Sequence, residues 1–135
     1  MRIDRLDHLV LTVVNIEATV SFYCDVLGFR RETFRGGRTA LVFGDAKINL
    51  HERGNEFDPK ALRPTPGSAD LCFITVTALD VVVDELRGHG VAIEEGPVER
   101  TGARGQIRSV YVRDPDDNLV ELSNYVTDSE TQDPL

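Results

Sequence analysis

The chain has 135 residues, with 15 Lys and Arg against 23 Asp and Glu, and a formal net charge of -8 at pH 7. This acidic balance lacks the basic footprint of a nucleic-acid-binding protein and disfavours anionic membranes as partners. No apolar run reaches membrane-spanning length, and the first residues lack the apolar core of a secretion signal. We therefore expect one cytoplasmic domain over residues 1–135 that binds neither nucleic acid nor membrane.

The first part of the chain predicts one strand, one helix and three further strands. Residues 6–13, LDHLVLTV, alternate in the manner of a strand. Asn15 is placed to cap a helix whose apolar positions recur at helical spacing until Gly28. Three alternating runs separated by glycine turns then predict a meander. These runs are residues 30–35, 39–43 and 47–52.

A long connection follows, ERGNEFDPKALRPTPGS, over residues 52–68. It contains three prolines and two glycines, has no periodicity, and is longer than a usual connection. It is either a linker or a flap over a site, and we expect it to close one end of a cavity and to set substrate choice.

The second part of the chain repeats the same order of elements. Residues 69–76 predict a strand, and Thr77 with Asp80 predicts a capping box for a helix that ends near Gly88. Three more strands are predicted, and the tail 127–135 is polar. These strands are residues 91–95, 106–113 and 118–125. The chain therefore divides into module one, about 4–53, the connecting loop 52–68, and module two, about 69–126.

The repeat also aligns individual residues. A shift of 62 places Asp70 on His8, and a shift of 72 places Glu121 on Asn49. A sheet with one helix on its back has a second face to cover, so two such units side by side can curl around a shared concavity.

Alternation gathers polar side chains on the face opposite the helices. Neighbouring side chains of a strand point to opposite faces, so the apolar partners leave a polar set on the concave side. This set is His8, Asn49, His51, Asp70, Cys72, Glu121 and Ser123. Imidazole and carboxylate suit a divalent metal such as Zn, Fe, Ni, Mn or Co. In the plainer alternative, Glu121 pairs with Arg108 or Arg113 and His8 is a satisfied core histidine.

Longer motifs carry a resemblance to a known family. The segments LDHLVLTV, TVSFYCDVLGFR and VYVRDPDDNLVELSNY resemble the vicinal oxygen chelate superfamily, which includes glyoxalase I, bleomycin-resistance proteins and extradiol dioxygenases. The segments FGDAKINLHERGNEFDPK, PGSADLCFIT and IEEGPVERTGARG resemble more narrowly the glyoxalase domain-containing protein 5 group and its virulence-associated relatives. The resemblance covers residues 4–126.

The resemblance implies an α+β fold in which two βαβββ modules form an open, mixed-sheet barrel around a concave site, commonly in a homodimer. It implies a divalent metal ion, Zn, Ni, Fe or Mn. His8 and Glu121 match family ligand positions, whereas Asp70 stands where relatives usually carry His. In the fourth strand the motif offers Asn49, with His51 one step along the same face. The implied ligand set is His8, His51, Asp70 and Glu121.

The resemblance implies two functions. In the first, the metal chelates two adjacent oxygens of a small substrate in a reaction of lyase, isomerase or dioxygenase type. A carboxylate released from the metal acts as the catalytic base, Glu121 or alternatively Asp70. In the second, the chain is a metal-free binding protein of the bleomycin-resistance type, which sequesters a small molecule or antibiotic. The residues expected to bind the substrate are Arg38, Asn49, Arg108 and Ser123.

Overall fold

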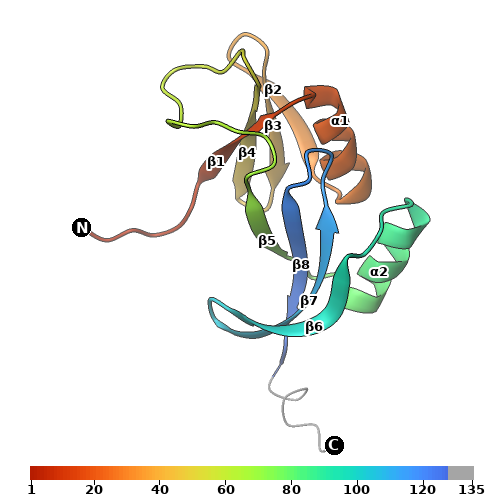
Figure 1. Ribbon diagram of the computed structural model, residues 1–135. Helices are drawn as coiled ribbons and strands as arrows, with labels where there is room; N and C mark the ends of the chain where they lie inside the picture. The colour runs from red at the N-terminus through yellow and green to blue at the C-terminus, as the bar shows by residue number, and fades with distance from the viewer. Residues whose placement is uncertain (128–135) are drawn as a thin grey trace, which may run out of the picture. The chain divides into compact units, whose positions relative to one another are not determined.

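The computed structural model describes residues 1–127 of the chain, so the predicted tail at 127–135 lies almost entirely outside the described residues. The chain forms two compact units. Unit 1 consists of Met1–Ala69 together with Asp114–Asn118, and unit 2 contains Asp70–Arg113 and the chain from Leu119 onward. Each unit has one four-stranded mixed sheet and a helix, which confirms the predicted α+β class (Figure 1).

Unit 1 has the predicted order of strand, helix and meander. Its elements are β1 (His8–Val13), α1 (Ile16–Val20), the π-helical turn η1 (Ser21–Val26), β2 (Arg30–Phe34), β3 (Arg38–Phe43) and β4 (Ala46–Glu52). The sheet order is β1-β4-β3-β2, with β1 parallel to β4 and the other pairs antiparallel. The sheet is open, because β1 and β2 are its two edges.

The helix of unit 1 begins as the sequence predicts and then widens. Asn15 is the N-cap, and its side chain accepts a hydrogen bond of 2.8 Å from the amide of Ala18. The predicted single α-helix stops at Val20 and continues as η1, in which the amide of Leu27 donates to the carbonyl of Phe22, five residues back. Gly28 ends the segment at φ 78°, which favours glycine.

The cap makes a modest, testable contribution to stability. Replacing Asn15 with alanine leaves an amide of the first turn without its acceptor. We expect the free energy of unfolding to fall by about 1 kcal/mol. Urea denaturation measures this, and an unchanged midpoint at equal slope would contradict the assigned cap.

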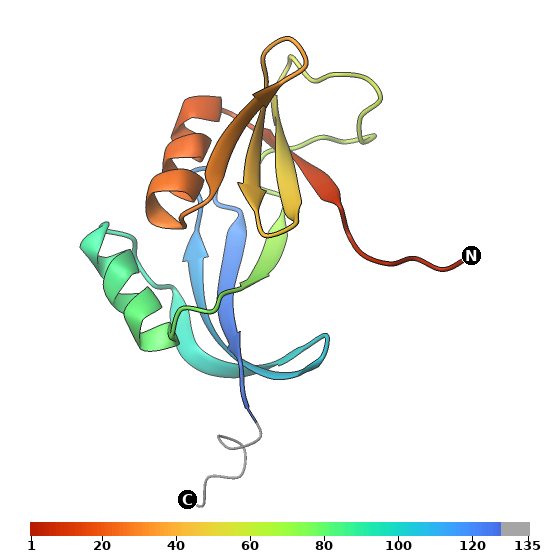
Figure 2. The same cartoon turned by 180° about the vertical axis from the view of Figure 1, so that it is seen from behind.

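The helix of unit 1 lies against its sheet (Figure 2), and the buried apolar side chains of the unit lie between them. Alternation turns one set of strand side chains toward α1 and η1, where Tyr23 is fully buried. The buried strand residues of this layer are Leu11, Val13, Leu41, Ile48 and Leu50. Burial of this apolar face fixes the register, because a slip of one residue would turn every one of these side chains outward.

Unit 2 repeats the arrangement. Its elements are β5 (Asp70–Ile74), α2 (Leu79–Gly88), β6 (Glu95–Gly102), β7 (Gly105–Arg113) and β8 (Leu119–Tyr125), in the sheet order β5-β8-β7-β6 with β5 parallel to β8. The second core is formed by helix residues Leu79, Val82, Val83 and Leu86 against Val110, Val112, Val120 and Leu122 of the sheet. This sheet is also open, with edges β5 and β6.

Two local predictions in unit 2 are wrong. The strand predicted at 91–95 lies instead at Glu95–Gly102, where an irregular register between Glu95 and Val98 accommodates Gly96-Pro97 at the sheet edge. Gly96 is required there, because a Cβ at this position would lie 2.4 Å from the Ser109 carbonyl oxygen. The predicted capping box is absent as well, since Ala78 is the N-cap of α2 and makes no side-chain cap bond.

The turn DPDDN between β7 and β8 belongs to unit 1. Asp114 is 4 % exposed and accepts a 2.8 Å hydrogen bond from the Tyr23 hydroxyl. Burial, and then the neighbouring Asp114 carboxylate, raises the pKa of Tyr23 far above its ordinary value. The Asn118 side chain accepts a hydrogen bond from the amide of Ala69, so the turn is tied to the end of the long connection.

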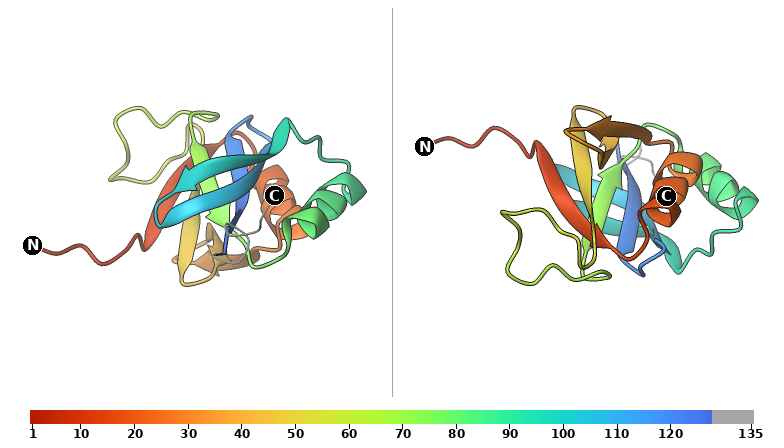
Figure 3. Two further views of the ribbon diagram at one scale, coloured as in Figure 1. Left: turned by 90° about the horizontal axis from the view of Figure 1, so that it is seen from below. Right: turned by 90° about the horizontal axis from the view of Figure 1, so that it is seen from above.

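The connection between β4 and β5 contains no further strand or helix, as predicted, and Figure 3 shows it as a wide excursion. Among the described residues, no helix is both long and apolar enough to cross a membrane.

The two sheets confirm the predicted residue equivalences. His8 opens β1 and Asp70 opens β5. Asn49 pairs with Val10, and Glu121 pairs with Cys72, at matching points of the parallel strand pairs. That residues 1–135 form one domain stays a prediction.

Candidate functional site

The sheets of unit 1 and unit 2 are called sheet 1 and sheet 2, and the polar face of sheet 1 is the one that the sequence predicts. His8 pairs with Lys47, Val10 with Asn49, and Thr12 with His51, so these side chains share the face opposite the helix. Asn49 also pairs with Ala40 of β3, which extends the same face across the sheet. Sequence alternation therefore placed His8, Asn49 and His51 correctly within unit 1.

His8 is held by the residue before it. Its Nδ1 lies 2.8 Å from the Asp7 carboxylate, and its side chain is 48 % exposed. The hydrogen bond to His8 lowers the pKa of Asp7, which keeps that carboxylate ionised. A carboxylate at Nδ1 favours the tautomer in which Nδ1 donates and Nε2 presents a lone pair, as in metal-binding histidines.

His51 has a different environment. It is 7 % exposed, and its Nδ1 is buried without a hydrogen-bond partner, as is Oδ1 of Asn49. The ring of Phe57, from the long connection, packs edge-on against His51 at 5.4 Å and lies 4.0 Å from the Arg38 guanidinium carbon. Burial lowers the pKa of His51, and the positive charge of Arg38 lowers it further, so the imidazole is neutral at pH 7.

Glu121 lies on the polar face of sheet 2 within a chain of hydroxyl groups. The fully buried Ser109 donates to Oε2 of Glu121 at 2.5 Å, a short charge-assisted bond. The Ser109 hydroxyl also lies 2.7 Å from that of Ser123, which in turn lies 3.4 Å from the sulfur of Cys72.

The direction of these bonds follows from the number of protons. Each hydroxyl has one proton, and that of Ser109 goes to the carboxylate, so Ser123 donates to Ser109. The remaining bond then runs from the Cys72 thiol to Ser123. Ser109 thus donates to Oε2 of Glu121, and the Ser123 hydroxyl lies 3.5 Å from the same oxygen.

Tyr111 faces Glu121 from the neighbouring strand, where the two residues pair. Its hydroxyl accepts a 3.0 Å hydrogen bond from Arg100, which also binds Glu95 at 2.7 Å. Burial raises the pKa of Tyr111, and the Glu121 carboxylate adds to the rise, while Arg100 opposes it. The tyrosine therefore remains a proton donor at neutral pH.

The alternative in which Glu121 pairs with Arg108 or Arg113 is wrong. Arg108 pairs with Asn124, one step out of phase with Glu121, so it lies on the opposite face of sheet 2. That position places Arg108 on the opposite face of its sheet from Ser123, another expected substrate-binding residue. Arg113 forms an ion pair of 2.8 Å with Glu94.

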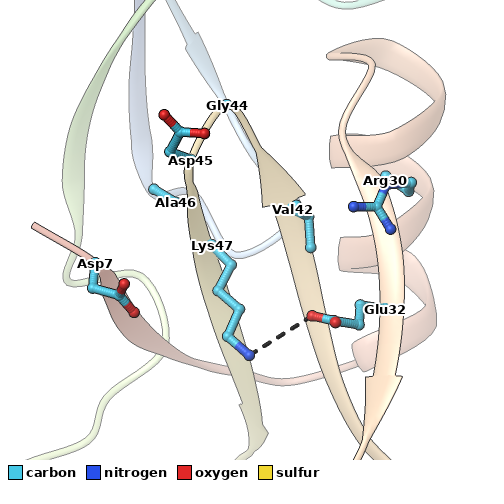
Figure 4. Close-up of a pocket in the computed structure, with 8 residues that line it drawn as sticks. All are labelled: Asp7, Arg30, Glu32, Val42, Gly44, Asp45, Ala46 and Lys47. Atoms are coloured by element: carbon cyan, nitrogen blue, oxygen red, sulfur yellow. Dashed lines mark ion pairs between the residues drawn. The ribbon is translucent and has the colours of Figure 1, made fainter.

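A pocket of about 300 Å³ lies on the polar side of sheet 1 (Figure 4). Its lining is mixed in charge, with Asp7, Arg30, Glu32 and Lys47 among its residues, and Lys47 lies 3.7 Å from Glu32. None of the predicted ligands or substrate-binding residues lines the pocket. Asp7, which does line it, forms a hydrogen bond with His8.

No group of three or more His, Cys, Asp or Glu side chains forms a ready-made metal cage among residues 1–127. Two of the predicted donors have hydrogen-bond partners of their own, Asp7 for His8 and Ser109 for Glu121. Asp70 is exposed at the start of β5.

Comparison with known families gives a match over residues 5–122 to the Glyoxalase/Bleomycin resistance protein/Dioxygenase superfamily. The chain belongs to this superfamily. Its members similar to this chain include the virulence protein STM3117 of Salmonella typhimurium, 62% identical over 93% of this chain and 88% of that protein. The crystal structure of STM3117 has a TM-score of 0.92 and covers 93% of this chain and 100% of that one.

Two further proteins extend the comparison. The glyoxalase domain-containing protein RDO1 of Mycosarcoma maydis is 51% identical over 93% of this chain and 70% of its own length. TnmS3 from Streptomyces sp. CB03234, an antibiotic binding protein, has 22% identity and a TM-score of 0.73 over 93% of this chain and 99% of its own, a likeness of fold alone.

Several residues of these networks were missed from sequence. Asp7 precedes His8 directly, so the pair was visible as a neighbouring acid and imidazole. Ser109 lies two residues before Tyr111 on a predicted strand, where alternation places both on one face. Phe57 gave no signal, because its contact with His51 crosses an aperiodic loop.

Proposed function

We propose that the chain is a glyoxalase-like, metal-dependent enzyme that acts on a small substrate through two adjacent oxygen atoms. The observation that carries the proposal is the support behind two donors: Asp7 orients His8, and Ser109 orients Glu121. Metal-binding imidazoles and carboxylates have such outer partners. The donor types fit a divalent ion, Zn, Ni, Fe or Mn.

The proposed ligands are His8, Asp70 and Glu121, with His51 or Asn49 as the donor from β4. When bound, the metal supplies Lewis acidity that stabilises negative charge developing on a substrate oxygen. Glu121 is proposed as the base, because its carboxylate lies on the polar face of sheet 2 and is held in place by the Ser109 hydroxyl. Whether the reaction is of lyase, isomerase or dioxygenase type depends on the substrate.

Substrate contacts are proposed on the same polar faces. Arg38 and Asn49 belong to unit 1 and Ser123 to unit 2. Arg108 is no longer included, since it faces the other side of its sheet. A homodimer, which the family resemblance suggests, and a cytoplasmic location are also part of the proposal, and sedimentation velocity tests the homodimer.

Sequestration of a small molecule without metal is the second candidate function. It is favoured by the fold shared with TnmS3, an antibiotic binding protein. Asp70 and Asn49, which replace more common family ligands, favour it too.

Calorimetric titration with metal, followed by a substrate panel, separates the two functions. The metal-free protein is titrated with Zn²⁺, Ni²⁺, Mn²⁺ and Fe²⁺ and then assayed on glutathione hemithioacetals, catechols and fosfomycin. The enzyme proposal expects one saturable site and turnover that depends on the bound metal. Turnover that is equal with and without metal would contradict it, and ligand binding without any metal site would establish sequestration.

A supporting prediction concerns the residue behind Glu121. Ser109→Ala removes the 2.5 Å bond to the carboxylate without touching a proposed ligand. We expect metal affinity to fall about 10-fold to 100-fold, as for other outer partners of metal ligands. Titration calorimetry measures the change, and Ser109→Thr, which keeps the hydroxyl, is the control. Equal affinity in Ser109→Ala would remove the positioning role.

A further inference from the structure

Arg38 carries a charge that nothing in the described residues neutralises. It opens β3, and in residues 1–127 its guanidinium makes no ion pair or hydrogen bond; its contact is the 4.0 Å approach to the Phe57 ring. A cation–π contact uses the face of the ring and consumes none of the five N–H donors. Arginine donors arranged in this way suit the two oxygens of a carboxylate or phosphate group.

His51 lies next to this free cation. Thr39 of β3 pairs with Leu50 of β4. In this antiparallel pair the next position places Arg38 opposite His51. Phe57 contacts both side chains, which makes the three residues one cluster. The second observation is that Nδ1 of His51 is buried and has no hydrogen-bond partner. The residue as a whole is only 7 % exposed. A neutral imidazole can donate one hydrogen bond from this atom.

The charges around His51 disfavour a metal ion there. Arg38 and Lys60 act on it as cations, and Glu56 is the opposing anion. A divalent ion at His51 would meet the repulsion of Arg38 at close range, whereas an anion would be attracted. Asn49, the equivalent of Glu121 in the repeat, has a buried amide oxygen without a partner and is the better β4 donor for a metal.

We propose that Arg38 and His51, covered by Phe57, form an oxyanion subsite for a carboxylate or phosphate group of the substrate. The assignment of this group to the substrate rests on the proposed function. The substrate is then an anionic small molecule, with its chelating oxygens separate from the charged group held by Arg38. In this proposal His51 is a substrate-binding residue and is not a metal ligand.

The test is calorimetric titration of the metal-free protein with inorganic phosphate and, separately, with benzoate. Two anions distinguish a phosphate-selective from a carboxylate-selective subsite. We expect saturable binding of at least one of them to the parent protein. Arg38→Gln should weaken this binding at least 10-fold, and Arg38→Lys, which keeps the charge without the planar donors, should lie between the two.

Arg31→Gln is the matched control, because Arg31 alternates onto the opposite face and is paired with Glu17 at 2.9 Å. It should bind either anion as the parent does. Equal binding by Arg38→Gln and the parent, or an equal loss in Arg31→Gln, would overturn the subsite. A thermal melt of each variant excludes unfolding as the cause.

A metal titration of the same variants separates this inference from the proposed function. We expect Arg38→Gln to bind metal as tightly as the parent, and His51→Gln to lose anion binding while keeping metal binding. If His51→Gln abolishes metal binding, His51 is a ligand and the subsite is wrong. If the parent binds no metal but Arg38→Gln still loses the anion, the enzyme proposal fails and the subsite stands.

Discussion

Glu121→Gln is expected to abolish high-affinity metal binding and, with it, turnover. The substitution keeps the size of the side chain but removes the charge toward which Ser109 donates at 2.5 Å. Outer partners of ligands alone contribute about 10-fold to 100-fold in affinity, so loss of the ligand charge should weaken binding by about 100-fold or more. Titration with Zn²⁺ and Ni²⁺ at constant pH measures it.

Glu99→Gln is the matched control for this prediction. Glu99 is an exposed residue of β6. In the strand register it lies opposite Arg108, on the face of the sheet away from Glu121. It carries the same change in net charge but should leave metal affinity unaltered. Metal binding that survives in Glu121→Gln would contradict the ligand assignment, and an equal loss in both variants would indicate a general charge effect.

Asp114→Ala is expected to cause the largest loss of stability among these substitutions. The buried carboxylate accepts hydrogen bonds from the Tyr23 hydroxyl, from the amides of Asp116 and Asn118, and from the Asn118 side chain, at 2.8–3.0 Å. Hydrogen bonds to a charged group contribute about 1.5–3 kcal/mol each, and their loss leaves buried donors unsatisfied. We expect the free energy of unfolding to fall by about 3 kcal/mol or more.

Urea denaturation with Tyr23→Phe as a companion tests this account. Tyr23→Phe removes one of the donors and should cost about 1–2 kcal/mol, less than Asp114→Ala. A loss below about 1 kcal/mol in Asp114→Ala would show that the turn is held by other contacts.

Strand alternation predicted most of the polar faces because it depends on local geometry. His8, Asn49 and His51 fell on one face of sheet 1, and Glu121 with Ser123 on one face of sheet 2, as their pairings show. The prediction for Arg108 was wrong. This residue was chosen for its charge, although strand alternation places it on the face of sheet 2 opposite Glu121. Helix boundaries marked by Asn15 and Gly28 were also readable from local chemistry.

Features that depend on distant contacts were not predictable in this way. The strand predicted at 91–95 has the apolar pattern, but the edge pairing with β7 begins at Glu95 and includes Gly96-Pro97. Phe57 reaches His51 from an aperiodic loop, and Asp114 reaches Tyr23 across 91 residues of sequence. Such contacts are selected by burial and packing in three dimensions rather than by periodicity.

The most direct test of the central claim is the metal content of the purified chain. The protein is prepared without chelator, loaded with Zn, Ni, Mn or Fe, desalted and analysed by inductively coupled plasma mass spectrometry, beside the His8→Ala, Glu121→Ala double variant. The account predicts about one metal ion per parent chain and almost none in the folded double variant. A metal-free parent under every loading condition, or equal metal in both proteins, would contradict it.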